Sequence, residues 1–285
     1  MSVSCATVMT RKGTSEATEG ALCDLLAAAR AAGVTLRFDA EETRKHGLSS
    51  GDGIVVDAPP SPDVDVCVVL GGDGTILSAL REYAGTGVPV FAVNFGQVGF
   101  LATVDPGGHQ EAFDRALSGD FDTIDLPGIV AVCTDSRATA FNDVSLHRKP
   151  GTRVAELSYA LGGEEIGRVR CDGLVVATPA GSTGYNLANG GPVLAWGVEG
   201  FVVSFVAPHS FTARPLVVAP GDVVTITNVS REDPVEMHAD GRPVRGLEAG
   251  ADVCVAFEPA RGRLAQLPGA TFYHRLRERF GRLAA

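Results

Sequence analysis

Short apolar runs alternate with longer amphipathic segments over the first third of the chain. The apolar runs predict buried strands at residues 34–38, 64–70 and 89–93. The amphipathic segments predict helices at residues 16–33, 75–83 and 109–117. Gly33 suits the end of the first helix, because glycine readily adopts the left-handed conformation that follows a helix. Strands that alternate with helices predict a doubly wound parallel sheet, in which ligands bind beyond the carboxyl ends of the strands.

The pattern changes near residue 122, where short β-like segments replace the helices. These segments lie at residues 129–133, 154–161, 165–170 and 223–229. Turn signals separate them, at Gly162-Gly163, Pro220-Gly221 and Asp240-Gly241. Residues 271–283 then show apolar side chains at helical spacing, with arginines on the remaining positions. We therefore expect an α/β domain over residues 1–122, a β-rich domain over 123–268, and a C-terminal helix within 269–285.

Composition narrows the classes of partner. The chain has 285 residues, of which 45% are hydrophobic and 20% charged, as is usual for a globular protein. Its 24 Lys and Arg against 34 Asp and Glu give a net charge of −10, which argues against nucleic acid or an anionic membrane as the main partner. The six cysteines contain no C-x-x-C pair, so we expect structural thiols and no metal site. The chain shows no signal peptide and no apolar run of membrane-spanning length, so we expect a cytoplasmic protein.

The sequence Gly71-Gly72-Asp73-Gly74-Thr75 follows directly on the apolar run at residues 64–70. Closely spaced glycines let backbone N–H groups approach a phosphate. A carboxylate repels phosphate, so Asp73 is more plausible as a metal ligand or as a base that takes a proton from an attacking hydroxyl. That pairing predicts phosphoryl transfer. The simpler interpretation is a tight turn in which Asp73 and Thr75 cap the next helix.

Two further clusters favour a nucleotide ligand. An apolar strand at residues 174–177 runs into a loop, continuing to residue 192, that is dense in hydroxyl, amide and glycine groups. Ser182, Thr183 and the loop amides can bind a ribose or purine, and Tyr185 offers a ring for stacking. Asn142-Asp143 places two polar side chains between apolar neighbours, as either a structural turn or a reader of ligand hydroxyls.

Taken in order, these motifs make the chain resemble the NAD kinases, which phosphorylate the adenosine ribose 2′-hydroxyl of NAD. The shared features are the turn at 71–75, Asn94-Phe95-Gly96 with Gly99-Phe100-Leu101, Asn142-Asp143, residues 172–192, Pro208-His209-Ser210 with Arg214-Pro215, Asp240-Gly241, and the terminal Phe272-Tyr273 with Arg275-Leu276-Arg277. The glycine turn alone also occurs in diacylglycerol-type lipid kinases and resembles part of the phosphofructokinase site. The Thr-Pro-x-Gly-Ser-Thr-x-Tyr segment after Asp172-Gly173 is much more specific to NAD kinases.

The resemblance implies a fold, substrates and roles. It implies an N-terminal α/β domain with a parallel sheet, a C-terminal β-rich domain, and a final helix that packs back on the first domain. Asp73 would contact the target ribose as the proposed general base, and the residues around the incoming phosphates would be Gly72, Gly74 and Thr75. The NAD-binding set would be Asp73, Gly74, Phe100, Asn142, Asp143, Asp172, Thr183, Gly184 and Tyr185. Phe100 would pack on adenine. Asp172 would act from a neighbouring subunit of a homo-oligomer (dimer or tetramer).

The resemblance also leaves alternatives open. It implies Mg²⁺, or another divalent cation, together with ATP, and polyphosphate is an alternative donor. Ala180, Gly184 and Ala188 depart from the residues common in the family, which puts substrate preference in doubt. The rival functions are a kinase for a lipid, nucleoside or sugar hydroxyl, and a non-catalytic NAD-binding homologue.

Overall fold

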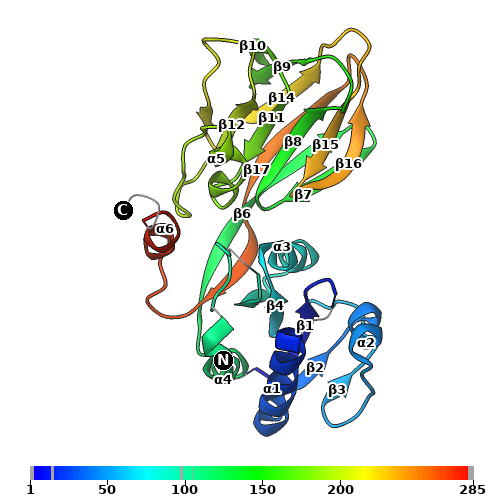
Figure 1. The fold of residues 1–285 in the computed structure, drawn as a ribbon, viewed down its shortest axis with the longest axis vertical. Coiled ribbons are helices and arrows are strands. Elements are labelled where there is room, and N and C mark those ends of the chain that lie inside the picture. Colours follow the sequence, from blue (N-terminus) through cyan, green and yellow to red (C-terminus); the bar gives the residue numbers. More distant parts are fainter. Residues whose placement is uncertain (1–2, 14–15, 97–98, 105, 282–285) are drawn as a thin grey trace. The chain divides into compact units, whose positions relative to one another are not determined.

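The computed structural model describes residues 3–13, 16–96, 99–104 and 106–281 (Figure 1). The chain divides into two compact units, one containing residues 1–125 and 262–285 and the other residues 126–261. Two long strands, β6 (Asp122–Cys133) and β17 (Asp252–Gln266), contribute residues to both units. The predicted domain boundaries at residues 122 and 268 remain predictions; residue 122 is the first residue of β6.

The first unit is built on a parallel sheet, as the sequence predicts. Its strands run in the order β5-β4-β1-β2-β3, and every neighbouring pair among them is parallel. The end of β17 adds a further parallel strand beside β5. The bounds are β1 (Cys5–Thr10), β2 (Thr35–Arg37), β3 (Ile54–Val55), β4 (Val66–Gly71) and β5 (Pro89–Asn94).

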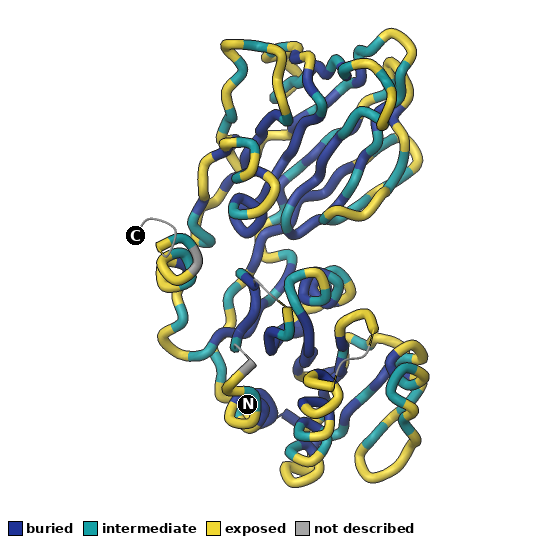
Figure 2. Tube along the Cα trace, in the orientation of Figure 1, coloured by how far each residue is buried: buried dark blue, intermediate teal, exposed yellow. Residues whose placement is uncertain are grey.

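Both faces of β4 are covered, which explains why this strand is apolar throughout. Val66, Val68 and Leu70 lie in a core with side chains of helices α1 and α4. Cys67 and Val69 alternate with them and are also fully buried, and helix α3 packs against β4 and β5. Figure 2 shows the buried residues of this unit following its central strands.

The four predicted helices of this unit are present, with one correction, and helix α2 was not predicted. The helices are α1 (Glu16–Ala32), α2 (Ala40–His46), α3 (Asp73–Glu82), α4 (His109–Ser118) and the C-terminal α6 (Phe272–Phe280). Helix α3 was expected from Thr75 but begins at Asp73. Gly72 is its N-cap, in an extended conformation and without a side-chain cap bond, so the helix starts directly after the strand. The predicted end of the last helix, Arg282 and Leu283, lies outside the described residues.

The second unit is a sandwich of antiparallel strands, which confirms the predicted β-rich C-terminal part. One layer has the order β13-β12-β11-β8-β15-β16, and the other contains β10-β9-β14-β17 together with the β6–β7 pair. Side chains of both layers form one apolar core. The remaining bounds are β7 (Ser136–Ala140), β8 (Asp143–Arg148), β9 (Ala155–Leu161), β10 (Glu164–Cys171), β11 (Gly173–Ala177), β12 (Phe201–Val206), β13 (Leu216–Val218), β14 (Val223–Asn228), β15 (Val235–Ala239) and β16 (Arg242–Leu247).

Two hairpin signals are confirmed, and the predicted length of one strand is wrong. Gly162-Gly163 joins the antiparallel pair β9 and β10, and Asp240-Gly241 joins β15 and β16. Strand β6 begins seven residues before the predicted segment at 129–133, because its first part is too polar to show a strand pattern. Among the described residues, no helix is long and apolar enough to span a membrane.

Candidate active site

The glycine turn lies at the carboxyl end of β4, where a doubly wound sheet binds its ligands. A Cβ added to Gly71 would lie 2.6 Å from the Thr75 hydroxyl oxygen, so the Thr75 side chain occupies the space above this glycine. A Cβ on Gly72 would lie 3.4 Å from the Cα of Gly96, in the loop after β5. Gly74 has open space beside it. The turn thus places the N-terminus of α3 beside the loop that follows β5, and a helix N-terminus can bind an anion.

Asp73 is the first residue of α3, and the N-cap position before it belongs to Gly72. Oδ2 accepts a hydrogen bond from the backbone N–H of Phe100 at 2.9 Å, and Oδ1 accepts one from the N–H of Leu101 at 3.2 Å. Gly72 is therefore the N-cap residue, and the Asp73 carboxylate holds the loop after β5.

Phe100 lies between the glycine turn and the C-terminal helix. Its ring centroid lies 5.8 Å from that of Phe272 and 6.3 Å from that of Phe280, both on α6. Arg275 of the same helix donates hydrogen bonds to the carbonyl oxygens of Phe100 and Ala102. The loop after β5 is thus held on two sides: Asp73 accepts hydrogen bonds from its backbone amides, and Arg275 of α6 donates hydrogen bonds to its carbonyl oxygens. These contacts keep Phe100 beside the glycine turn.

In the second unit, Asp240 organises the turn that carries Asn142 and Asp143. Its Oδ1 accepts the backbone N–H groups of Phe141 at 3.0 Å, Asn142 at 2.7 Å and Asp143 at 3.3 Å. Asp240 has a φ of 47°, a left-handed conformation that aspartate tolerates better than most residues. The sequence singled out Asp240-Gly241 as a turn and as a shared family feature, but it did not reveal this anchoring role.

Asp143 is a buried carboxylate close to a second one. Its side chain is 7% exposed, and burial together with the negative charge of Asp240 raises the pKa of Asp143 to about 7. Both causes disfavour the charged form. At neutral pH the protonated and ionised forms of Asp143 are both populated, so this group can either donate or accept a hydrogen bond from a ligand hydroxyl.

The loop after β11 packs against the same turn. A Cβ on Gly181 would lie 2.0 Å from the carbonyl oxygen of Asn142, so only glycine allows this approach. Thr178 bonds to the turn twice, by its N–H to the carbonyl of Asn142 at 2.9 Å and by its hydroxyl to the carbonyl of Phe141 at 2.5 Å. The Thr183 hydroxyl donates to the carbonyl of Ala180 at 3.1 Å, and Gly184 leads into the short helix α5 (Tyr185–Ala188).

Tyr185 and Asp172 complete the predicted set in this unit. Burial and the charges of Asp143 and Asp172 raise the pKa of the Tyr185 hydroxyl, so the two carboxylates lie near this phenol. Asp172 accepts a hydrogen bond from Nε of Arg148 at 2.6 Å. The structure therefore gathers Asn142, Asp143, Asp172, Thr183, Gly184 and Tyr185 in the second unit, and it gathers Gly72, Asp73, Gly74, Thr75 and Phe100 in the first. Three further residues were not among the predicted site residues: Arg148, Asp240 and His147. The contacts of His147 are described below.

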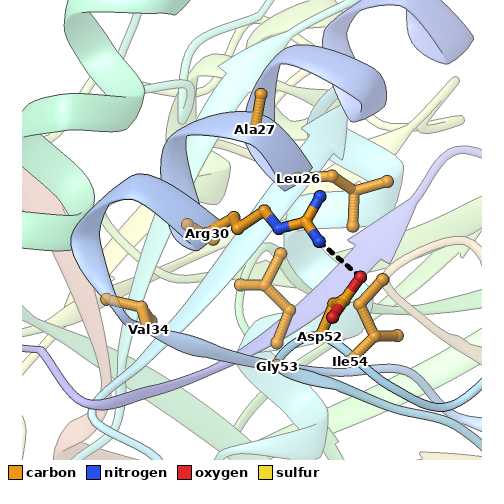
Figure 3. Close-up of a pocket in the computed structure, with 9 residues that line it drawn as sticks. Leu26, Ala27, Arg30, Val34, Asp52, Gly53 and Ile54 are labelled. Carbon is orange, nitrogen blue, oxygen red and sulfur yellow. Dashed lines mark hydrogen bonds and ion pairs between the residues drawn. The ribbon is translucent and has the colours of Figure 1, made fainter.

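The hollow drawn in Figure 3 lies elsewhere in the first unit. Side chains of α1, β2 and β3 line it, including Leu26 and Ile54, and the Arg30–Asp52 ion pair lies beside it at 2.5 Å. Both ion-pair side chains are largely exposed. None of the predicted site residues lines this hollow.

The two units and their turns define a class of protein: a kinase with a Gly-Gly-Asp-Gly-Thr turn on a parallel α/β unit, followed by a β sandwich. Family models match both parts, the ATP-NAD kinase N-terminal domain at residues 54–121 and the ATP-NAD kinase C-terminal domain at residues 141–261. The chain belongs to the NAD kinase family.

Relatives and solved structures agree with this assignment. The NAD kinase of Gemmatimonas aurantiaca is 35% identical over 266 residues, covering 90% of this chain and 89% of the relative. The NAD kinase of Symbiobacterium thermophilum is 36% identical over 230 residues, covering 78% and 81%. The fold is similar to that of yeast NADH kinase complexed with NADH, with a TM-score of 0.85 and 23% identity, covering 100% of this chain and 89% of that one. It is also similar to an NAD kinase from Archaeoglobus fulgidus in complex with ATP, with a TM-score of 0.74, 23% identity and 98% of both chains covered.

Proposed function

We propose that this chain is an NAD kinase that transfers the γ-phosphoryl group of ATP to the 2′-hydroxyl of the adenosine ribose of NAD, giving NADP and ADP. The observation that carries this proposal is the placement of Asp73. Its carboxylate is held by two amides of the loop after β5 and stands between two glycines at the start of α3. A base and a set of phosphate-binding amides thus occupy one turn.

In the proposed reaction, the ribose hydroxyl oxygen bonds to the γ-phosphorus while the bond from that phosphorus to the leaving oxygen of ADP breaks. Asp73 accepts the proton of the hydroxyl. Amide groups of Gly72 and Gly74, at the N-terminus of a ten-residue helix, stabilise the negative charge on the transferring group. Thr75 would lie beside the phosphates with them, while its own N–H donates to the carbonyl oxygen of Gly72 at 2.9 Å. The glycines leave room for the backbone to approach the phosphates.

The acceptor set is assigned mainly to the second unit. Asn142 and Asp143 would bind ribose hydroxyls, and a carboxyl group that titrates near pH 7 suits a partner that both donates and accepts. Thr183, Gly184 and Tyr185 would frame the NAD, and Phe100 would pack against the adenine. Asp172 would complete the site of a neighbouring subunit in a homo-oligomer (dimer or tetramer).

Magnesium would reach the site as part of its substrate, bound to ATP. Among the described residues, no group of three or more His, Cys, Asp and Glu side chains is placed to hold a metal ion. Mg²⁺ is usually held by substrate phosphates and water with one or two protein carboxylates, so a dedicated cluster of protein ligands is not needed for an ion that arrives with ATP. The ion would neutralise phosphate charge during transfer. The cytoplasmic location remains a prediction.

The test is direct. Purified full-length protein is incubated with NAD, Mg²⁺ and either ATP or polyphosphate, and NADP is measured with an NADP-specific dehydrogenase. We expect NADP with ATP. Product with polyphosphate alone would overturn the choice of donor, and no product with either donor would overturn the proposal in favour of another acceptor or a non-catalytic homologue. Parallel reactions with NADH, a lipid, a nucleoside and a sugar identify the acceptor.

A further inference from the structure

One face of strand β8 carries polar side chains in the second unit. Val144 and Leu146 point into the apolar core, so Asp143, Ser145 and His147 lie on the opposite face. On the neighbouring strand β15, His238 is the register partner of Ser145. His238 is therefore a diagonal neighbour of His147, a spacing across which aromatic side chains make contact.

The His147 ring is fixed between two other rings. It stacks on Tyr185 with centroids 5.5 Å apart and an interplanar angle of 26°. It meets the ring of His238 edge to face, with centroids 5.5 Å apart and an angle of 62°. Among the described residues, His147 makes the only aromatic contact of Tyr185, which is itself 36% exposed. His147 thus lies against one face of this partly exposed tyrosine ring.

The neighbouring strand leaves space for this arrangement. Gly173 on β11 is the register partner of His147, and a Cβ there would lie 2.9 Å from Nδ1 of His147. Burial and the proximity of His238 lower the pKa of His147, so its ring is neutral at pH 7. A neutral imidazole stacks on a phenol ring without bringing a charge into the half-buried site.

We propose that His147 is a positioning residue for the acceptor nucleotide: it supports the Tyr185 ring in its binding orientation, and His238 fixes His147 in turn. This inference rests on the proposed function only in taking Tyr185 as a contact of NAD. A tyrosine ring held in place before binding loses less freedom when the ligand arrives, so the support increases affinity without touching the reacting atoms.

The experiment replaces the ring while keeping its bulk. We expect His147→Leu to raise both the KM for NAD and the calorimetric Kd for NAD by about two- to tenfold, the range that corresponds to one aromatic pair. The kcat and the KM for ATP should stay within about twofold of wild type, because the residue acts through binding of the acceptor. His147→Phe restores a ring and should return the Kd to within about twofold of wild type. His274→Ala, at a half-exposed position on α6, is the control histidine and should leave the Kd unchanged.

A double-mutant cycle separates positioning through Tyr185 from independent contact with the ligand. We expect His147→Leu combined with Tyr185→Ala to bind NAD no more weakly than Tyr185→Ala alone. Additive losses, an unchanged Kd in His147→Leu, or a loss of kcat at constant KM would each overturn the inference. Circular dichroism and thermal melts establish that the variants fold, and if His147→Leu does not fold, His147→Asn, which also removes the ring, takes its place in the same cycle with the same expected result. Absence of NADP formation by the wild-type protein would count against the proposed function, whereas the binding cycle tests the support of Tyr185 separately.

Discussion

Replacement of Asp73 by Asn removes a charge at the position assigned to the base and also disturbs a loop. The two carboxylate oxygens accept the N–H groups of Phe100 and Leu101. Asparagine has a single oxygen, and its NH₂ group would face the other N–H. A hydrogen bond to a charged group contributes about 1.5–3 kcal/mol, and the low end applies to this half-buried site. We therefore expect Asp73→Asn to lower the free energy of unfolding by about 1.5 kcal/mol.

The effect on turnover should be much larger than this loss of stability. A general base contributes about 10²–10⁴-fold to rate, so kcat should fall by at least about 100-fold. A domain with an unfolding free energy of about 5–15 kcal/mol remains almost entirely folded after losing about 1.5 kcal/mol, so unfolding cannot account for such a loss. Urea titration followed by circular dichroism measures the first quantity, and coupled detection of NADP measures the second.

Arg275→Ala provides the matched control for the loop. Arg275 donates to the carbonyls of Phe100 and Ala102, so the variant loosens the same loop and leaves the Asp73 carboxylate in place. We expect a similar loss of stability with less than about a tenfold loss in kcat. The assignment of Asp73 as base would be refuted by an Asp73→Asn kcat within tenfold of wild type. A loss in Arg275→Ala as large as that in Asp73→Asn would instead show that loop position alone controls turnover.

Three further predictions concern the second unit. Asp240→Ala removes the acceptor of the backbone amides in the turn before β8. This variant should lower the unfolding free energy by about 2–3 kcal/mol and raise the KM for NAD. An unchanged urea midpoint would contradict the anchoring role of Asp240. Because the pKa of Asp143 is raised to about 7, the folded protein keeps a proton that the unfolded chain releases near pH 4. The unfolding free energy of wild type relative to Asp143→Asn should therefore fall from about pH 4 to about pH 7 and stay level above pH 7. A difference that stays constant in urea titrations across that range would contradict the raised pKa. Gly181→Ala places a Cβ 2.0 Å from the Asn142 carbonyl oxygen, so it should lower the unfolding free energy by about 2–4 kcal/mol and weaken NAD binding. The control is Gly197→Ala, where the added Cβ meets open space. Equal thermal midpoints for the two variants would refute the close approach.

The local elements of the fold were largely predictable from pattern. The run at residues 64–70 is apolar throughout because β4 is covered on both faces, and such a run indicates a buried strand without further information. The hairpin at Gly162-Gly163 was predictable because both glycines adopt positive φ angles. The start of α3 was misplaced by two residues, because a glycine N-cap without a side-chain bond has no sequence signature. Strand β6 was predicted too short. Helix α2 and several strands were not predicted: β1, β3, β7, β8, β12, β13, β15, β16 and β17.

Part of the candidate site was also predictable, but only because its residues lie in motifs. Asp73 and Asn142-Asp143 stood out because carboxylates and amides beside glycines or apolar runs suggest chemistry. A single histidine at position 147, which the structure places in strand β8, carries no such signal. Its stacking partner Tyr185 is far along the chain, and His238 is further still. No short-range pattern predicts that these three rings meet.

The sequence by itself determined the parallel and antiparallel parts of the fold, the glycine turn, and the family, because each depends on local periodicity or on residues in a short ordered motif. The tertiary structure alone decided what those residues contact. It placed the Asp73 carboxylate on the amides of a loop 27 residues away, and it placed Asp240 on a turn 98 residues away. It also decided the raised pKa of Asp143, since burial and a neighbouring charge are properties of the packed chain. Contacts between distant residues and the loss of water around them arise only when the chain folds, and the chemistry of the site depends on both.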